Sequence, residues 1–289
     1  MPELPEVETV KLGLTKYLIG HRILKVDINN PKVFSGNTEN IEGAKVKDVR
    51  RFAKVLSIDL DNDFSIIIHI KLTGQLIYRG PNLPNPTTLS KKVIGGVPGK
   101  HTHIVFELDR KGFLYYNDLR RFGWLKVIKT SDVETSSFIG KLGPEPFGKI
   151  KGKPSLLTRG LFKEILSKSS RPIKIVIMDQ EKMGGVGNIY AADALWLAKI
   201  SPKRSANSLA PNEQIELYGA ILEVLKRGLK WGGASELMFV TPDGSEGEYQ
   251  NHTLAYGHQG EVCERCHKAK FEKYFLGGRG TYVCPNCQK

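Results

Sequence analysis

The sequence predicts an α+β fold with several domains, because three different patterns follow one another along its 289 residues. Short segments rich in β-branched and aromatic residues, separated by turn residues, fill the first half and predict a β-sandwich. Beyond about residue 160, apolar residues recur three and four positions apart, which predicts helices. All four cysteines then lie near the C-terminus. We expect a β-sandwich, a helical domain and a small cysteine-based module, in that order.

The β-rich half begins with a helix. Val7, Val10, Leu14 and Leu18 recur at helical spacing, and acidic residues in the first turns suit the positive end of a helix dipole, so we expect a helix over Leu4–Leu18. About six to eight strands should follow and form the sandwich. The strands that the pattern marks are Ile23–Ile28, Val55–Leu60, Ser65–Ile70, His103–Leu108, Phe113–Tyr116 and Trp124–Ile128.

A linker and three helices are expected in the second half. Proline, glycine and lysine are frequent between residues 144 and 158, which predicts a linker. Apolar residues at helical spacing then predict helices over Leu161–Leu166, Ile189–Leu197 and Ile215–Leu229. Gly232 and Gly233 follow the last of these segments and should end its helix.

The cysteines follow a C-x2-C-x17-C-x2-C pattern made by Cys263, Cys266, Cys284 and Cys287. Two C-x-x-C turns at this separation bring four thiolates around one tetrahedral zinc ion, whose binding stabilises a segment too short to bury its own core. We therefore expect one structural Zn²⁺ in a zinc finger. Two disulfides in a secreted protein are the alternative. Since no export-type apolar stretch follows Met1, we expect a reducing compartment, the cytoplasm.

The charge of the chain points to a polyanionic partner. There are 43 basic and 30 acidic residues, so the formal net charge is +13 and the pI is about 9.5. Nucleic acid is the first candidate, because each phosphate that a protein neutralises releases condensed counterions. Solubility alone is the other explanation of this charge. The apolar run Ile66–Ile70 is much shorter than the roughly 20 residues of a membrane span, so we expect no membrane partner.

A glycine-rich turn, Gly184–Gly187, precedes the second of the expected helices, which begins at Asn188. Glycine allows another backbone to approach closely, and the free N–H groups at a helix start face outward together with the positive end of the dipole. This arrangement holds a phosphate group. A glycine-rich turn by itself is more often only a turn, so the neighbouring motifs decide its meaning.

Three motifs now stand together: the N-terminal Met1-Pro2-Glu3-Leu4-Pro5-Glu6-Val7-Glu8-Thr9, the glycine–asparagine turn, and Gly278-Arg279-Gly280-Thr281 before the last two cysteines. Together they resemble the formamidopyrimidine-DNA glycosylase (Fpg/MutM) family, in the same order and at compatible spacings from Pro2 to Gln288. The resemblance implies a β-sandwich carrying the N-terminal helix, a helix–two-turns–helix domain and a zinc finger. It also implies a bifunctional DNA glycosylase and abasic-site lyase that excises oxidised purines, formamidopyrimidines and 8-oxoguanine, in base excision repair.

Removal of the initiator methionine, which a small second residue permits, leaves Pro2 with a free secondary amine. An α-amino group has a reference pKa near 8, against about 10.4 for lysine, so more of it is a neutral nucleophile at pH 7. The resemblance implies that this amine forms a Schiff base with the sugar and that β,δ-elimination follows. It makes Glu3 the acid/base residue and Lys54 a catalytic lysine beside the lesion's phosphate. Glu6 matches a supporting position, although helix capping explains it equally well.

The resemblance also assigns residues to the DNA backbone and to the lesion. His69 matches a phosphate contact, and Asn188 and Arg279 match residues that grip the phosphates on either side of the lesion. Lys174 matches a lysine that points toward the lesion site. Contacts to phosphates position the duplex without reading its sequence, so we expect the protein to scan double-stranded DNA generally.

Three further residues match those that fill the duplex after the damaged nucleotide is extruded. Arg120 matches the residue that pairs with the orphaned base, and Phe122 matches an aromatic wedge, although a phenylalanine is more often part of a core. Leu72 stands where the family usually has methionine. Both side chains are apolar wedges, so we expect the void to be filled despite this change.

One departure concerns the choice of lesion. Residues 234–255 have about the length of the loop that caps an oxidised purine in this family. Ser235-Glu236-Leu237-Met238-Phe239, however, lacks the arginine–aspartate pair usually found there. The resemblance therefore supports the reaction type more strongly than the preferred lesion.

We expect domains over residues 1–143 (catalytic β-sandwich), 159–233 (helix–two-turns–helix) and 256–289 (zinc finger), with a linker over 144–158 and a capping loop over 234–255. The expected partner is damaged double-stranded DNA, bound by a monomer at the nucleoid. Two other functions stay open. An endonuclease VIII-like enzyme for oxidised pyrimidines is disfavoured by Leu4, where that branch tends to have glycine. A non-catalytic zinc-ribbon protein that binds damaged DNA is the second.

Overall fold

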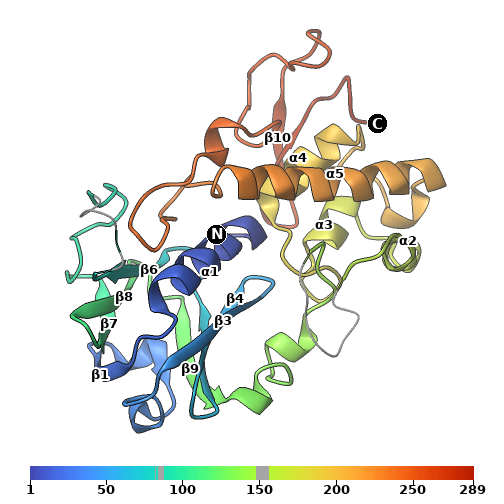
Figure 1. Cartoon of the computed structure of the whole chain (residues 1–289). Helices are drawn as coiled ribbons and strands as arrows, with labels where there is room; N and C mark the ends of the chain where they lie inside the picture. The colour runs from blue at the N-terminus through green and yellow to red at the C-terminus, as the bar shows by residue number, and fades with distance from the viewer. Residues whose placement is uncertain (82, 84–87, 148–155) are drawn as a thin grey trace. The chain divides into compact units, whose positions relative to one another are not determined.

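The structure is a computed structural model of the whole chain, and it describes residues 1–81, 83, 88–147 and 156–289 (Figure 1). The chain divides into two compact units. Unit 1 comprises Met1–Gly140 and Leu229–Gln250, and unit 2 comprises Lys141–Gly228 and Asn251–Lys289. Each unit therefore combines two stretches that are far apart in the sequence.

Unit 1 contains the helix α1 and, among the described residues, nine strands. The helix spans Leu4–Leu18, as its apolar spacing predicts. The six strands predicted from the sequence are present with closely similar bounds, and three more accompany them. The strands are β1 (Ile23–Ile28), β2 (Phe34–Ser35), β3 (Val46–Phe52), β4 (Val55–Leu60), β5 (Phe64–His69), β6 (Gly74–Arg79), β7 (Thr102–Leu108), β8 (Gly112–Asp118) and β9 (Trp124–Lys129).

The strands form a four-stranded sheet with the order β1-β7-β8-β6 and a five-stranded sheet with the order β2-β9-β5-β4-β3. Neighbouring strands are antiparallel except for the short parallel pair β2–β9. Buried side chains from both sheets and from α1, among them Leu14, Ile58 and Phe106, share one hydrophobic core. The predicted β-sandwich is therefore confirmed.

The three additional strands lack a clear strand pattern in the sequence. In β3 the buried residues are Val46, Val49 and Phe52, a spacing closer to a helix than to the two-residue period of a strand. The register of β3 against β4 shifts after Val46, which accounts for part of this spacing. β6 begins with a glycine, and β2 has only two residues. Pairing with neighbouring strands, rather than local composition, makes these segments strands.

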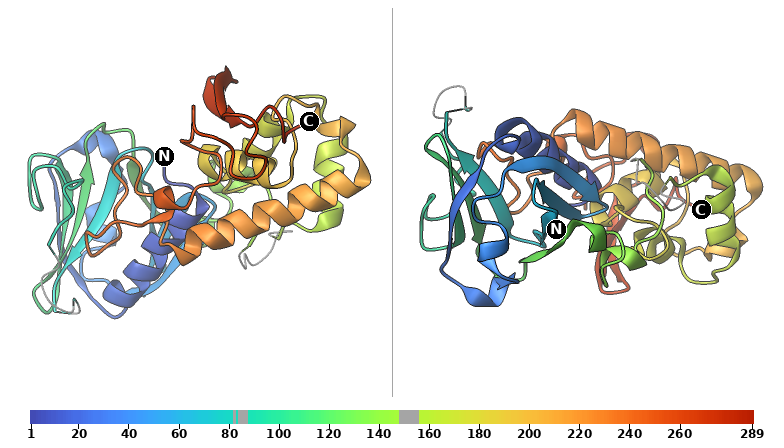
Figure 2. Two further views of the ribbon diagram at one scale, coloured as in Figure 1. Left: turned by 90° about the horizontal axis from the view of Figure 1, so that it is seen from above. Right: turned by 60° about the horizontal axis from the view of Figure 1, so that its bottom comes forward.

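Unit 2 contains four helices and a β-hairpin among the residues described, and Figure 2 shows its long helix α5 in two further views. The sequence predicts three of the helices but not α3, whose six residues are apolar except for one lysine and give no periodicity. The last residues of α5 continue into unit 1. The elements are α2 (Arg159–Ser167), α3 (Ile173–Met178), α4 (Asn188–Leu197), α5 (Pro211–Lys230), β10 (Glu272–Leu276) and β11 (Arg279–Val283).

The predicted linker over 144–158 is described only at its ends, because residues 148–155 lie outside the described residues. On one side the Gly184 N–H donates to the Pro144 carbonyl oxygen at 3.0 Å. Across the gap the Leu157 N–H donates to the Glu145 carbonyl oxygen at 2.7 Å.

Short 3₁₀ segments are also present in both units. They are Pro31–Val33, Thr38–Asn40, Thr130–Asp132, Ile139–Lys141, Ala206–Ser208 and Tyr249–Asn251.

None of the helices in the described part of the chain combines the length and the apolar character that a bilayer crossing requires. The longest, α5, is amphipathic: Leu217, Ile221, Val224 and Leu225 are buried, whereas Ile215 is exposed. Its apolar stripe is therefore the buried side of the helix.

The helix α1 is expected to contribute strongly to the stability of unit 1, because it packs on β3, β4 and β6 (Figure 1). Leu14 is fully buried in the core and Leu12 is 55% exposed in the same helix. Leu14→Ala should lower the free energy of unfolding by about 2–5 kcal/mol, and Leu12→Ala by about 0.5 kcal/mol or less. Urea unfolding of both variants measures this difference. Equal losses would mean that α1 does not pack as described.

Candidate active site and zinc site

The chain starts at a buried group of acids. Glu3, just before α1, is 3% exposed, and Glu6 in its first turn is 1% exposed. The Glu6 carboxylate accepts a hydrogen bond from the Glu3 N–H at 2.7 Å and a second one from the Ala234 N–H, also at 2.7 Å. The capping role that the sequence suggests for Glu6 is therefore present. The same carboxylate also fixes the start of α1 to a segment that lies far along the chain.

Gly233 makes this attachment possible. Its φ of +84° favours glycine, and a Cβ atom at this position would lie 2.8 Å from the Glu6 Cγ atom. The backbone can approach the acid only because no side chain intervenes. The position of Gly233 after an apolar helical segment predicts only a helix stop, and the structure reveals its contact with Glu6.

Lys54 lies in the turn between β3 and β4 and is 5% exposed, as buried as the acids at the chain start. Burial is the main cause that lowers the pKa of the α-amino group at Met1. The negative charges of Glu3 and Glu6 raise this pKa, and the positive charge of Lys54 lowers it. The four groups are therefore close enough to act on one another's charges. The structure gathers Pro2, Glu3, Glu6 and Lys54 in unit 1 around one terminal amine.

His69, the last residue of β5, is buried, and its Nδ1 accepts a hydrogen bond from the Lys71 N–H at 3.0 Å. Burial, followed by the charges of Lys71 and Lys54, lowers the pKa of His69 to about 3. The ring is therefore neutral at pH 7, with its proton on Nε2, which is available as a donor to a phosphate oxygen.

The residues predicted to fill the duplex lie at the surface of unit 1. Leu72 is half-buried in the turn between β5 and β6. Arg120 and Phe122 are exposed in the turn between β8 and β9, and the Arg120 guanidinium lies 4.8 Å from the centre of the Phe122 ring. Phe122 is 58% exposed. The interpretation of Phe122 as a core residue is wrong, and its solvent-facing ring agrees with a contact to a partner.

In unit 2, Asn188 is the first residue of α4, at the end of the glycine-rich turn. Its Oδ1 atom is shielded from solvent and has no hydrogen-bond partner in the part of the chain that the structure describes. Gly185 has a φ of +100°, so the turn uses the conformational freedom of glycine. Oδ1 is an acceptor, so a phosphate oxygen at this helix start would be contacted by the Nδ2 group and the backbone N–H groups instead.

Lys174 in α3 is fully buried, and its ammonium donates to the Gly280 carbonyl oxygen at 2.9 Å and to the Thr281 hydroxyl at 2.8 Å. Both acceptors follow Arg279, which is exposed at the start of β11. Lys174 is thus directed at the hairpin that carries Arg279. Its predicted approach to the lesion stays a prediction.

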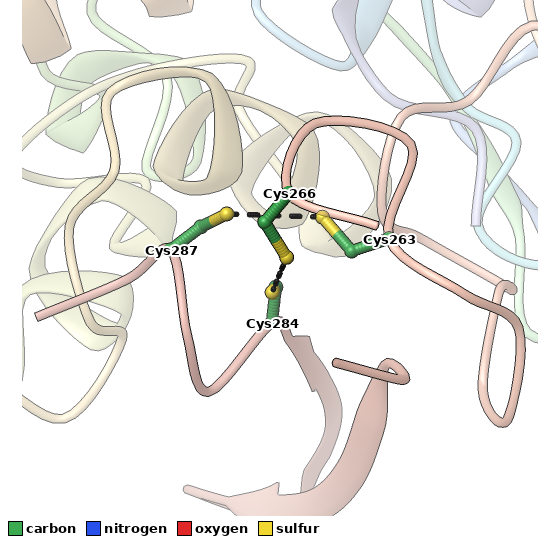
Figure 3. A group of neighbouring side chains, drawn as sticks. All are labelled: Cys263, Cys266, Cys284 and Cys287. Carbon is green, nitrogen blue, oxygen red and sulfur yellow. Dashed lines mark hydrogen bonds between the residues drawn. The ribbon is translucent and has the colours of Figure 1, made fainter. Parts of the chain in front are cut away.

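The four cysteines converge at the other end of the same hairpin, and Figure 3 shows their side chains pointing at a common centre. All four are free thiols, so the disulfide alternative is wrong. The sulfur atoms of Cys263 and Cys287 are 3.8 Å apart, and those of Cys266 and Cys284 are 3.7 Å apart. A tetrahedral zinc site with Zn–S bonds of about 2.3 Å has S–S separations of about 3.8 Å. The residues fit one structural zinc ion.

The fold and these sites define the class of the protein: a DNA-repair enzyme of the helix–two-turns–helix type with a zinc finger. The model of the formamidopyrimidine-DNA glycosylase N-terminal domain matches residues 1–125, and that of the formamidopyrimidine-DNA glycosylase H2TH domain matches residues 142–239. The chain belongs to the formamidopyrimidine-DNA glycosylase family. The predicted fold class and family are confirmed.

Full-length relatives agree with this assignment. The formamidopyrimidine-DNA glycosylase of Herpetosiphon aurantiacus is 37% identical over the whole of both chains. A crystal structure of Lactococcus lactis Fpg with DNA containing an abasic site covers 99% of each chain, with 33% identity and a TM-score of 0.84. Another, of wild-type Lactococcus lactis Fpg (MutM) with DNA containing N7-benzyl-Fapy-dG, covers 100% of each chain, with 32% identity and a TM-score of 0.85.

The neutral state of His69 predicts a pH dependence. Its pKa in the folded chain, about 3, lies below the ordinary value of 6.5, so the unfolded chain binds the proton first as the pH falls. The contribution to stability is therefore complete above about pH 6.5 and decreases by about 2 kcal/mol on going to pH 5. Urea unfolding at both pH values should show this loss, and His69→Gln should reduce it. An NMR signal of His69 that titrates near pH 6.5 would contradict the assignment.

The zinc site predicts a stoichiometry of one metal ion per chain. Cys266→Ser should lose the ion, because a neutral hydroxyl does not replace a thiolate ligand, and the thermal stability of unit 2 should fall with it. His267→Gln is the matched control, since His267 is adjacent to Cys266 but outside the cluster of cysteines. Elemental analysis of purified protein measures the zinc content. Loss of zinc from the His267 variant would mean that the ligand set differs.

Proposed function

We propose that the chain excises oxidised purines, formamidopyrimidines and 8-oxoguanine, from duplex DNA and then cleaves the strand at the resulting abasic site. The observation that carries this proposal is the terminal amine surrounded by Glu3, Glu6 and Lys54 in a chain of this family. A zinc ion held by the four cysteines would have a structural role.

The reaction begins when Met1 has been removed and the Pro2 nitrogen carries the free amine. Burial lowers the pKa of the α-amino group in the chain that retains Met1. Pro2 is buried as well, so we expect burial to increase the neutral fraction of its amine at pH 7. Its lone pair attacks the sugar C1′ atom, and the base leaves with a proton. Glu3 protonates the ring oxygen as the sugar opens to an iminium ion.

The iminium ion draws electrons from the sugar and makes a C2′ proton acidic. Removal of this proton expels the 3′ phosphate, and a second elimination expels the 5′ phosphate. Water then hydrolyses the Schiff base and returns the amine. Glu3 relays protons in these steps, and Glu6 acts through it by fixing the Glu3 backbone. Lys54 places a positive charge beside the phosphate of the lesion.

Contacts to phosphates come from both units. Neutral His69 donates its Nε2 proton, Asn188 donates through its Nδ2 group together with the N–H groups at the start of α4, and exposed Arg279 supplies a positive charge. Lys174 supports Arg279 by holding the backbone of β11. Leu72 and Phe122 wedge into the stack while Arg120 pairs with the orphaned base.

The choice of lesion depends on the segment after Gly233. The Ser235 hydroxyl donates to the Phe239 carbonyl oxygen at 2.9 Å and accepts from the Gly247 N–H at 2.8 Å. Glu236 and Leu237 are exposed between these anchors. We infer that this segment caps the extruded base through its backbone, since the arginine–aspartate pair usual in the family is missing. Neither rival function, an endonuclease VIII-like enzyme or a binding-only protein, is favoured by the comparisons.

We further propose that the protein acts as a monomer on genomic DNA at the nucleoid, in the cytoplasm. One chain carries the amine, the phosphate contacts and the zinc finger, and four free thiols suit a reducing compartment. The domain boundaries given from the sequence also stay proposals.

Borohydride trapping tests the proposed chemistry, because reduction of the iminium ion leaves a stable covalent adduct. Met1-free protein should form the adduct on DNA containing 8-oxoguanine. A chain that retains Met1 should bind this DNA without forming it, since its Pro2 nitrogen is a non-nucleophilic amide and its free amine is displaced by one residue from the position of the Pro2 nitrogen. Glu3→Gln should slow excision by about 10²–10⁴-fold, and Pro2→Gly should weaken trapping.

Glu216→Gln, which changes an exposed acid on α5, is the control and should react like the unaltered protein. Absence of any adduct from zinc-loaded, DNA-binding protein would favour the binding-only function. An adduct mapped by mass spectrometry to another side chain would remove Pro2 from the mechanism.

A further inference from the structure

Asp118, the last residue of β8, is a fully buried carboxylate that accepts hydrogen bonds from four donors. Its Oδ1 atom accepts from the Thr73 hydroxyl and from the Arg120 N–H, the latter at 3.2 Å. Its Oδ2 atom accepts from the Tyr116 hydroxyl at 3.1 Å and from the Gly123 N–H at 2.8 Å. The two backbone N–H groups can only donate, and each lies on a different carboxylate oxygen, so both oxygens serve as acceptors.

These donors belong to the two turns that carry the exposed wedge residues. Thr73 directly follows Leu72, and the N–H groups of Arg120 and Gly123 bracket Phe122. The Arg120 N–H also donates to the Thr73 hydroxyl oxygen at 3.0 Å. One carboxylate and one hydroxyl thus fix the two turns to each other.

The backbone of the second turn depends on this attachment. Arg121 has a φ of +57°, a conformation that is rare for residues other than glycine and persists only where the surroundings hold it. A Cβ atom on Gly123 would lie 2.0 Å from the Tyr116 hydroxyl and 2.9 Å from the His69 carbonyl oxygen. The turn is therefore packed closely against both β8 and the end of β5.

We propose that Asp118 is the positioning residue that holds Leu72, Arg120 and Phe122 in the arrangement needed to fill the space left by an extruded nucleotide. The proposal rests on the proposed function. Exposed side chains such as Phe122 make few contacts that restrict them, so the rigidity of the set comes from the backbone below it. Fixing the turns before DNA binds reduces the ordering cost of wedge insertion.

The alternative is that Asp118 only stabilises the fold, and Asp59 provides a matched control. Asp59 in β4 is 7% exposed and accepts from the hydroxyls of Ser57 and Ser65, each at 2.7 Å, and from the Arg50 guanidinium. It is a buried carboxylate with several donors in the same unit, but it holds no turn assigned to DNA. Asp59→Asn therefore measures the general effect on activity of replacing a buried, hydrogen-bonded carboxylate in unit 1.

The test compares two reactions of Met1-free, zinc-loaded protein. Excision of 8-oxoguanine from a duplex requires wedge insertion, whereas borohydride trapping on an abasic site in single-stranded DNA has no opposite base to displace. Asp118→Asn should slow duplex excision by about 10- to 100-fold and change trapping by about threefold or less, because the amide NH2 group faces a backbone N–H that can only donate. Thr73→Val should act in the same direction more weakly, and Asp59→Asn should leave the ratio of the two rates unchanged.

A second readout follows the wedge directly. 2-Aminopurine beside the lesion should brighten when the stack opens in the unaltered protein, and this change should be reduced in the Asp118 variant. An unchanged ratio in Asp118→Asn, or the same change in Asp59→Asn, would overturn the positioning role. If Asp118→Asn does not fold, the ratio of duplex excision to trapping in Thr73→Val tests the positioning role, and an unchanged ratio overturns it. Failure of the unaltered protein to form any adduct would refute the proposed chemistry instead, while the fluorescence change would still test Asp118.

Discussion

The two hydrogen bonds that the Glu6 carboxylate accepts are the constraint on which the arrangement of the N-terminal residues depends. It accepts from Glu3, two positions from the chain terminus, and from Ala234, which lies 228 residues beyond Glu6. Terminal residues are ordinarily the least ordered part of a domain. Here Pro2 and Glu3 are buried and the Glu3 N–H is held, so the Pro2 nitrogen has a defined position, as the proposed attack on a sugar requires.

Burial also sets the charge states around this amine. It lowers the pKa of the α-amino group and keeps His69 neutral. The charge of Lys54 also lowers the pKa of the amine, whereas the charges of Glu3 and Glu6 raise it. An amine whose pKa is lowered is neutral more often than a lysine, so burial of the chain start supports the proposal that a terminal amine is the nucleophile.

Helix α4 links the glycine-rich turn of unit 2 to the cysteine cluster. Its first residue is Asn188, and its last turn is held by Arg265, which lies between two cysteine ligands. The Arg265 guanidinium donates to the Trp196 carbonyl oxygen at 2.6 Å and lies 3.9 Å from the centre of the Trp196 ring. A cation at a helix C-terminus also interacts favourably with the dipole. Zinc binding therefore supports the helix that presents Asn188.

The sequence by itself determined the bounds of α1, six of the strands, the cysteine cluster and the family, because these depend on local periodicity, fixed spacing and ordered motifs. Only the tertiary structure decided that β3 and β6 are strands, that Phe122 is exposed, that Lys174 holds the hairpin of Arg279, and that Asp118 joins two turns. Each of these depends on partners distant in sequence, and no local pattern encodes which backbone or side chain will face a residue across the fold.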